Sequence, residues 1–204
     1  AMNNPSFNAV YMHGFINDAQ GRKMSKSLGN YILPDEVIKK YGADTLRYYM
    51  ISSANPGVDL NYNFEDLKVK YRNLAVLWNL HNYLIDLAGN ADANPKDLRI
   101  RKDRFSTEER YIFSKLNSAI RKATKAFDSY KLNEIPLIIE DLFLKLSRTY
   151  IQLTREKAAG DEKKVALYAV YNVIMESLKM FAPVAPFITE RMYQNQKGKF
   201  SFEE

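Results

Sequence analysis

Residues 63–88 have the sequence NFEDLKVKYRNLAVLWNLHNYLIDLA, and this stretch decides the fold. Asn63 is a preferred helix N-cap, and Asp66 follows where an acid favours a helix start. After this helix start, mostly apolar side chains recur at helical spacing and form one stripe: Leu67, Tyr71, Leu74, Trp78, His81 and Ile85. A second row of leucines widens the stripe: Leu77, Leu80, Leu84 and Leu87. Because one neighbour cannot cover so wide an apolar arc, the stretch predicts a long, largely buried helix in a mainly α fold. We expect His81 and Trp78 to be core residues of this helix.

Further helical patterns follow. After an irregular stretch over 89–105, the capping box Ser106-Thr107-Glu108-Glu109 predicts a helix to about residue 130. Its expected apolar row is Phe113, Leu116, Ile120, Ala123, Phe127 and Tyr130. Asn133 is expected to cap a third long helix, with a buried row of Ile139, Leu142, Phe143, Leu146, Tyr150 and Leu153 and with Arg148, Arg155 and Lys157 outside the core. A fourth helix is expected over about 162–181, and a short last one over about 186–194. Long amphipathic helices with short joins predict a helical bundle, whose domain we place at residues 63–204.

Residues 1–62 are predicted to form a smaller body. Its first part, about 9–23, has the strand residues and turn cluster of a short hairpin. Pro34 opens a short helix, a second one is expected over about 43–52, and 58–62 is expected to be extended. Residues 31–62 thus form a compact connector between two larger bodies.

A basic segment, GRKMSKSLGN at residues 21–30, interrupts this smaller body. Burying its lysines would cost more than Met24 and Leu28 could return, so the segment does not belong in a core. Glycines that let the backbone bend, hydroxyl donors and lysine charges suit the capture of a polyanion. A solvated basic turn is the alternative that the lysine spacing alone leaves open.

The letters of this segment carry a resemblance. Lys23-Met24-Ser25-Lys26-Ser27 is identical to the KMSKS signature of class I aminoacyl-tRNA synthetases. The flanking stretches resemble the branch that charges isoleucine, valine and leucine, and most closely the archaeal type of isoleucyl-tRNA synthetase: His13-Gly14-Phe15, Leu28-Gly29-Asn30, Tyr41-Gly42-Ala43-Asp44, Tyr71-Arg72-Asn73-Leu74 and Leu77-Trp78-Asn79. The resemblance covers nearly the whole chain, strongly before about residue 80 and more loosely after it.

This resemblance implies an ATP-dependent ligase that attaches isoleucine to its tRNA, with Mg²⁺ accompanying ATP in the intact enzyme. It implies that Lys26, assisted by Lys23, stabilises the leaving pyrophosphate, that Ser25 and Ser27 hold phosphate oxygens, and that Met24 shapes the loop against adenosine. The family's HIGH signature and its nucleotide-binding sheet are absent from the sequence, and neither of its two histidines lies in such a motif. We therefore expect a C-terminal fragment, inactive alone: a catalytic remnant with the stem-contact connector at 1–62, then a truncated anticodon-binding bundle at 63–204.

Charge placement predicts the contacts with tRNA(Ile). The net charge is +6 and the pI near 9.3, which permits a polyanionic partner without requiring one. The candidate phosphate contacts lie in the irregular stretch, on one face of the helix that follows and near residue 155: Arg99, Arg101, Lys102, Arg104, Lys115, Lys122 and Arg155.

Composition excludes several other classes. The chain has 0 cysteines, which removes disulfides and thiolate metal sites, so we expect no protein-bound metal and no zinc in this segment. No run of about 20 apolar residues is present, so we expect no membrane partner. The resemblance implies a monomer in the cytoplasm. Three alternatives stay open: a valyl or leucyl relative, a stand-alone tRNA-binding helical module without catalysis, and a plain bundle with a coincidental basic loop.

Overall fold

The helices and strands of the computed structural model, which describes residues 5–7 and 9–200, follow in chain order. They are β1 (Ile16–Asn17), α1 (Pro34–Tyr41), α2 (Ala43–Ser53), β2 (Leu60–Asn61), α3 (Phe64–Ala91), the 3₁₀ turn η1 (Lys102–Arg104), α4 (Thr107–Asp128), α5 (Glu134–Lys145), the π turn η2 (Leu146–Tyr150), α6 (Ile151–Leu153), α7 (Arg155–Ala159), α8 (Lys163–Phe181) and α9 (Pro186–Phe200). The mainly α expectation is confirmed. No helix within the described ranges is both long and apolar enough to cross a bilayer.

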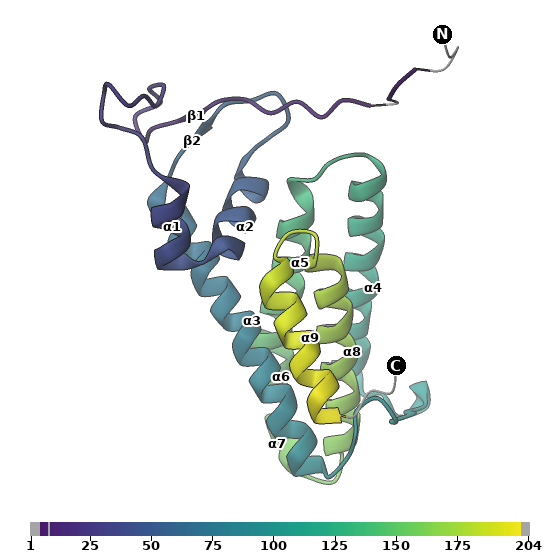
Figure 1. Cartoon of the computed structure of the whole chain (residues 1–204). Coiled ribbons are helices and arrows are strands. Elements are labelled where there is room, and N and C mark those ends of the chain that lie inside the picture. The colour runs from purple at the N-terminus through teal and green to yellow at the C-terminus, as the bar shows by residue number, and fades with distance from the viewer. Residues whose placement is uncertain (1–4, 8, 201–204) are drawn as a thin grey trace.

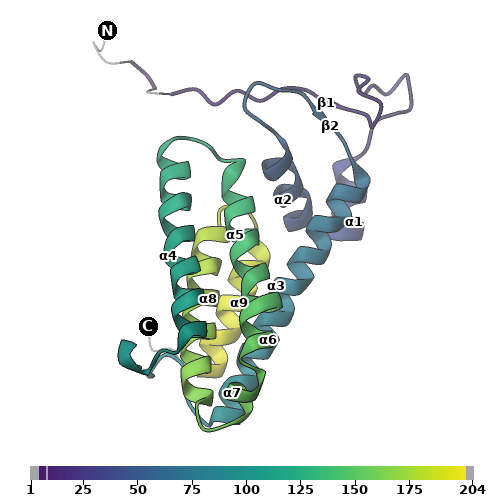
Figure 2. The ribbon, with the colours of Figure 1, turned by 180° about the vertical axis from the view of Figure 1, so that it is seen from behind.

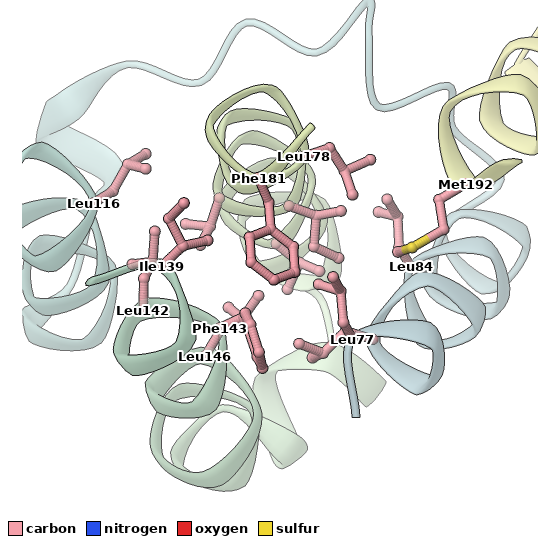
Figure 3. Close-up of a cluster of buried hydrophobic side chains, with 14 of the residues drawn as sticks. Leu77, Leu84, Leu116, Ile139, Leu142, Phe143, Leu146, Leu178, Phe181 and Met192 are labelled. Atoms are coloured by element: carbon pink, nitrogen blue, oxygen red, sulfur yellow. The ribbon is translucent and has the colours of Figure 1, made fainter. Parts of the chain in front are cut away.

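The bundle is formed by α3, α4, α5, α8 and α9, which lie side by side in both views (Figures 1 and 2). Its core is drawn in Figure 3, where Phe181 of α8 lies among side chains from the neighbouring helices. From α3, Leu77 and Leu84 point into this core and are fully buried. His81 is also buried, within 3.2 Å of the Gln196 amide, which confirms it as a core residue. Tyr71 is the exception to the predicted stripe, because 47% of its surface is exposed.

Two of the predicted helix starts are confirmed. Asn63 Oδ1 accepts hydrogen bonds from the backbone N–H groups of Glu65 and Asp66, at 2.9 and 3.3 Å. Ser106 and Glu109 form the predicted capping box at the start of α4. Each cap satisfies N–H groups that have no partner within the helix.

Asn133 lies at the predicted N-cap position of α5, but its side chain makes no capping hydrogen bond. Its backbone is helical (φ −69°, ψ −25°), whereas a capping side chain usually needs an extended backbone at this position. Instead, Asn133 Nδ2 donates to Oδ1 of Asn55 at 2.8 Å and joins the bundle to the loop after α2.

The third long helix is broken where a continuous one was predicted. The π turn η2 follows α5, and Thr154 separates α6 from α7 while its hydroxyl donates to the Tyr150 carbonyl at 2.8 Å. Because a π turn adds a residue to one helical turn, it rotates the residues after it relative to the core. Leu153 is therefore 64% exposed, against the prediction. Lys157 was predicted to lie outside the core but is partly buried, and its ammonium lies 2.9 Å from the buried carboxylate of Glu109.

The buried face of α4 also differs from the predicted row. Phe127 and Tyr130 are 36% and 57% exposed. Three of the six buried residues of this helix are alanines: Glu109, Ile112, Leu116, Ala119, Ala123 and Ala126. Alanines let neighbouring helices approach closely, whereas the predicted row follows the larger side chains.

The predicted hairpin at residues 9–23 is wrong in its pairing. Its turn is present, with Asp18 N–H donating to the Arg22 carbonyl at 2.8 Å, but only a single antiparallel bridge joins Asn17 to Lys23. β1 pairs with β2 instead, in parallel, with Ile16 opposite Leu60. The pair is fastened by Phe15, whose N–H donates to Asp59 Oδ1 and whose carbonyl accepts from the Leu60 N–H, each at 2.8 Å.

The connector is attached to the bundle mainly through α2. Arg47 donates to the carbonyls of Val184 and Pro183 at 3.1 and 2.8 Å. The Tyr48 hydroxyl bonds Glu140 of α5, which also accepts from Lys70 of α3 at 2.7 Å. A buried cluster of Val37, Tyr49, Tyr62 and Leu67 continues across residues 62 and 63. The division of the chain at that point stays a prediction of the sequence.

Candidate nucleotide-binding loop and basic groove

The basic segment at residues 21–30 forms a loop between β1 and α1 that extends away from the bundle (Figure 1). Its base is organised by Asp18, a carboxylate that is only 6% exposed. Asp18 accepts from the backbone N–H groups of Gln20 and Arg22 at 3.0 and 2.9 Å, from Arg22 Nε at 2.8 Å and from Asn30 Nδ2 at 2.9 Å. The hydrogen bond from Asn30 contributes most to holding the pKa of Asp18 far below its usual range, against the opposing effect of burial.

The lysines of the loop are its exposed charges. Lys26 is exposed, and within the described residues its ammonium has no ion pair or hydrogen bond. Lys23 is also exposed, and its ammonium lies 5.6 Å from the ring centroid of Phe15. The loop therefore presents two exposed cationic side chains.

The other residues of the loop hold its shape. Met24 is partly buried and packs against the cluster of Val37, Tyr49, Tyr62 and Leu67. Ser25 Oγ accepts from the Leu28 N–H at 3.3 Å and lies 3.2 Å from Ser27 Oγ. In this conformation the serine hydroxyls bond within the loop, and Met24 attaches the loop to the connector.

The described residues form no metal centre beside the loop. The described ranges contain no group of three or more His, Cys, Asp or Glu residues that could hold a metal ion. His13, the histidine nearest the loop in sequence, is exposed, lies outside β1, and has Nδ1 2.8 Å from the carbonyl of Gly14. No residue of the described chain is therefore assigned to Mg²⁺.

The seven expected tRNA contacts do not form one surface. Arg99, Arg101, Lys102 and Arg104 lie between α3 and α4, at the end of the bundle away from the strands (Figure 1). Two of them bond locally: Arg99 donates to the Lys96 carbonyl at 2.7 Å, and Arg101 pairs with Asp103 at 2.9 Å. Arg155 of α7 is exposed and donates to Gln152 at 3.2 Å.

Lys115 and Lys122 instead line a groove of about 740 Å³ between α4 and α5. The groove carries five lysines and two acids: Lys115, Lys122, Lys125, Lys131, Lys145, Glu134 and Asp141. The acids pair with Lys131 and Lys145 at 3.1 and 2.6 Å, while the other three lysines have no ion pair within the described residues. The sequence places Lys115, Lys122 and Lys125 on one helix face, but no local signal shows that Lys131 and Lys145 lie across from it.

Family models match both parts of the chain. Residues 1–63 match the tRNA synthetases of class I (I, L, M and V), and residues 109–204 match the anticodon-binding domain of tRNA ligase. The chain belongs to the class I aminoacyl-tRNA synthetases. A plain helical bundle with a coincidental basic loop is therefore excluded.

Relatives of this synthetase chain include isoleucine–tRNA ligases. Those of Methanosarcina barkeri, Methanopyrus kandleri and Pyrococcus horikoshii are 40%, 36% and 33% identical to it and match 93%, 92% and 95% of its length. The chain spans only 18% of the first two relatives and 19% of the third. The resemblance to the isoleucyl type that the sequence indicated is confirmed.

Solved structures show that the fold is shared within class I. A ternary complex of Agrobacterium radiobacter K84 agnB2 LeuRS with tRNA and LeuAMS superposes with a TM-score of 0.71 at 23% identity, over 90% of this chain and 22% of that one. Mycobacterium tuberculosis methionyl-tRNA synthetase in complex with methionyl-adenylate gives 0.75 at 20% identity, over 89% and 36%. At these identities the likeness concerns the fold alone.

Proposed function

We propose that this chain is the part of an isoleucine–tRNA ligase that supplies the KMSKS loop for ATP and a binding surface for tRNA(Ile). The exposed Lys26 ammonium, without an ion pair within the described residues, is the observation that carries the proposal. Similarity to isoleucine–tRNA ligases at 33–40% identity supports isoleucine as the amino acid. In keeping with that family, we also propose a monomeric parent enzyme in the cytoplasm.

In the proposed reaction the isoleucine carboxylate attacks the α-phosphate of ATP. The bond from that phosphorus to the bridging oxygen breaks, pyrophosphate leaves, and the adenylate later passes its acyl group to the tRNA 3′ end. Charge grows on the leaving pyrophosphate, so cations aimed at it lower the barrier. Lys26 takes this role with Lys23 beside it, Ser25 and Ser27 contribute hydrogen bonds to phosphate oxygens, and Mg²⁺ arrives as part of the substrate.

Phosphates of the tRNA backbone are proposed to bind along the α4–α5 groove. Lys115, Lys122 and Lys125 recur on one face of α4, so Lys115 and Lys125 are about 15 Å apart along its axis. Lysines on both walls match a strand of regularly spaced phosphates better than a single anion. Five further exposed basic residues outside the groove are also proposed as phosphate contacts: Arg99, Arg101, Lys102, Arg104 and Arg155.

Pyrophosphate exchange tests the proposed reaction. The full-length protein that carries this chain should exchange pyrophosphate into ATP with isoleucine and far more slowly with valine or leucine. The chain of residues 1–204 alone should give no exchange, because the sequence has no HIGH signature. Exchange driven by valine or leucine would assign the chain to those relatives. A full-length protein that binds tRNA but exchanges with none of the three would favour a binding module.

A further inference from the structure

The side chain of Asn30 closes the KMSKS loop at its base. Its Oδ1 accepts from the backbone N–H of Ser25 at 3.0 Å, and its Nδ2 donates to the Lys23 carbonyl at 3.3 Å and to Asp18 Oδ2 at 2.9 Å. One amide group thus contacts the backbone on both sides of Met24. The loop from Lys23 to Asn30 becomes a closed ring without contacts from the two lysine ammoniums.

Asp18 fixes this ring to the rest of the molecule. Its carboxylate is buried and bonds Asn30 on one side and both the backbone and guanidinium of Arg22 on the other. Asp18 directly follows β1, which is paired with β2 ahead of α3. The chain of contacts therefore runs from the connector through Asp18 and Asn30 to the backbone that carries Lys26.

We propose that Asn30 and Asp18 are positioning residues that set where the Lys26 ammonium meets the phosphates of ATP. This inference rests on the proposed function. Neither side chain needs to touch the nucleotide, because each acts on the backbone of the loop. A displacement of about 1 Å in a charge that stabilises a leaving group costs on the order of 100-fold in rate, which makes the ring consequential for catalysis.

Kinetics of the full-length enzyme test the proposal. Asn30→Ala should lower kcat for pyrophosphate exchange by about 10- to 100-fold, with the KM for isoleucine unchanged. In a Lys26→Ala background the same substitution should change the rate less than about twofold, because its target is already gone. Asn82→Ala, at an exposed asparagine of α3, is the matched control. Equal losses with and without Lys26 would overturn the proposal.

A variant in which the two side chains are swapped tests for rescue. The single change Asn30→Asp places a carboxylate against that of Asp18 and should slow pyrophosphate exchange as much as Asn30→Ala. The double variant Asp18→Asn/Asn30→Asp restores one donor and one acceptor between positions 18 and 30 and keeps an acceptor for the Ser25 N–H. Because Asp at position 30 cannot donate to the Lys23 carbonyl and the amide nitrogen of Asn at position 18 cannot accept from Arg22 Nε, we expect a partial rescue, with kcat above that of Asn30→Asp and below wild type. A double variant no faster than Asn30→Asp would show that the pair does not act through this contact.

Amide hydrogen exchange on residues 1–204 separates the ring from the proposed function. The Ser25 amide should exchange slowly in the wild-type chain and about tenfold or more faster in Asn30→Ala, whatever the parent enzyme does. If the full-length protein shows no isoleucine-dependent pyrophosphate exchange while the Ser25 amide is protected in residues 1–204, the proposed function fails and the ring remains. If the Ser25 amide is equally fast in both, the ring itself is wrong.

Discussion

The carboxylate of Asp44 in α2 accepts a hydrogen bond of 2.6 Å from the backbone N–H of Ile188 in the first turn of α9. A second, longer contact of 3.4 Å comes from the N–H of Phe187. The first N–H groups of a helix have no partner within it and attract negative charge, so Asp44 acts as a cap supplied by another helix. One short side chain thereby attaches the connector to the last helix of the bundle.

Replacing Asp44 by alanine should destabilise the chain. Loss of a cap costs about 1 kcal/mol, and this cap also joins two parts of the fold. Urea denaturation of Asp44→Ala should show a lower midpoint, with Asp44→Asn, which keeps an acceptor, much closer to wild type. The effect of pH is distinctive, because burial raises the pKa of Asp44 above its ordinary 3.8 despite the two N–H donors. A raised pKa means that the folded state binds the proton more tightly than the unfolded state. The contribution of Asp44 to the free energy of unfolding therefore falls as pH rises from 3.8 through the folded pKa. Asp44→Asn should remove that trend.

Glu109 should show the opposite trend with pH. Its fully buried carboxylate accepts from Tyr150 at 2.8 Å and Lys157 at 2.9 Å. Burial alone would raise its pKa, but hydrogen bonds from Ser106, Lys157 and Tyr150 outweigh burial and lower it. Its stabilisation is therefore present above the unfolded pKa, near 4.5, and is lost as pH falls through the folded value. Glu109→Gln should lower the free energy of unfolding, measured by urea denaturation, by about 2 kcal/mol at pH 7 and by less at pH 3. The exposed Glu156→Gln is the control, and equal effects at both pH values would contradict the prediction.

Gly14→Ala should disrupt the pairing of β1 with β2. A Cβ at Gly14 would lie 2.4 Å from the Val58 carbonyl carbon and 2.5 Å from the Asp59 nitrogen, and backbone atoms cannot move aside cheaply. We expect a loss of about 1–3 kcal/mol in the pairing, read as faster amide exchange at Leu60, whose N–H bonds the Phe15 carbonyl. Gly89→Ala, where a Cβ meets nothing within 4 Å, should be neutral or stabilising. Unchanged protection of Leu60 would refute the close approach.

Lys26→Ala should slow pyrophosphate exchange in the full-length protein by on the order of 100-fold, or about 3 kcal/mol in the barrier. The loss should appear in kcat, because the charge that Lys26 meets develops in the transition state. Lys39→Ala, an exposed lysine of α1, controls for the loss of one positive charge. An unimpaired rate in Lys26→Ala would remove this residue from the mechanism.

Charge removal in the α4–α5 groove should weaken RNA binding and its dependence on salt. For residues 1–204 and tRNA(Ile), the slope of log K against log salt should fall by about one for each phosphate that a removed lysine had neutralised. We expect the magnitude of this slope to fall by nearly two in Lys122→Gln/Lys125→Gln, with binding measured by fluorescence anisotropy. Lys39→Gln/Lys164→Gln removes the same charge from exposed positions outside the groove. Equal slopes in the two double variants would place the RNA elsewhere.

The sequence predicted those parts of the fold that depend on local contacts. Asn63 and the pair Ser106–Glu109 cap their helices through neighbouring N–H groups, so spacing alone identified them. Asn133 has the right residue type for a cap, but a distant partner, Asn55, takes its side chain. The π turn after α5 was equally out of reach, because it accompanies the buried contacts of Tyr150 and Lys157 with a glutamate in another helix.

The candidate site divides in the same way. The residues from Lys23 to Ser27 were singled out by their letters, and in the structure Lys23, Lys26 and Ser27 are exposed while Met24 and Ser25 are partly buried. The contact between Asp18 and Asn30 was not foreseen, because polar residues in a turn offer many partners of equal merit. Lys131 and Lys145 were missed because only the packing of α5 on α4 brings them to the groove.

The parallel register of β1 and β2 has a consequence for how the chain folds. Parallel strands cannot be joined by a tight turn, and here the connection contains the KMSKS loop, α1 and α2. Closing so long a loop costs entropy before the few ladder bonds can repay it, so this pairing should form late, after both helices have settled on α3. The geometry of the KMSKS loop, which begins at the end of β1, would then be among the last features that a newly made chain acquires.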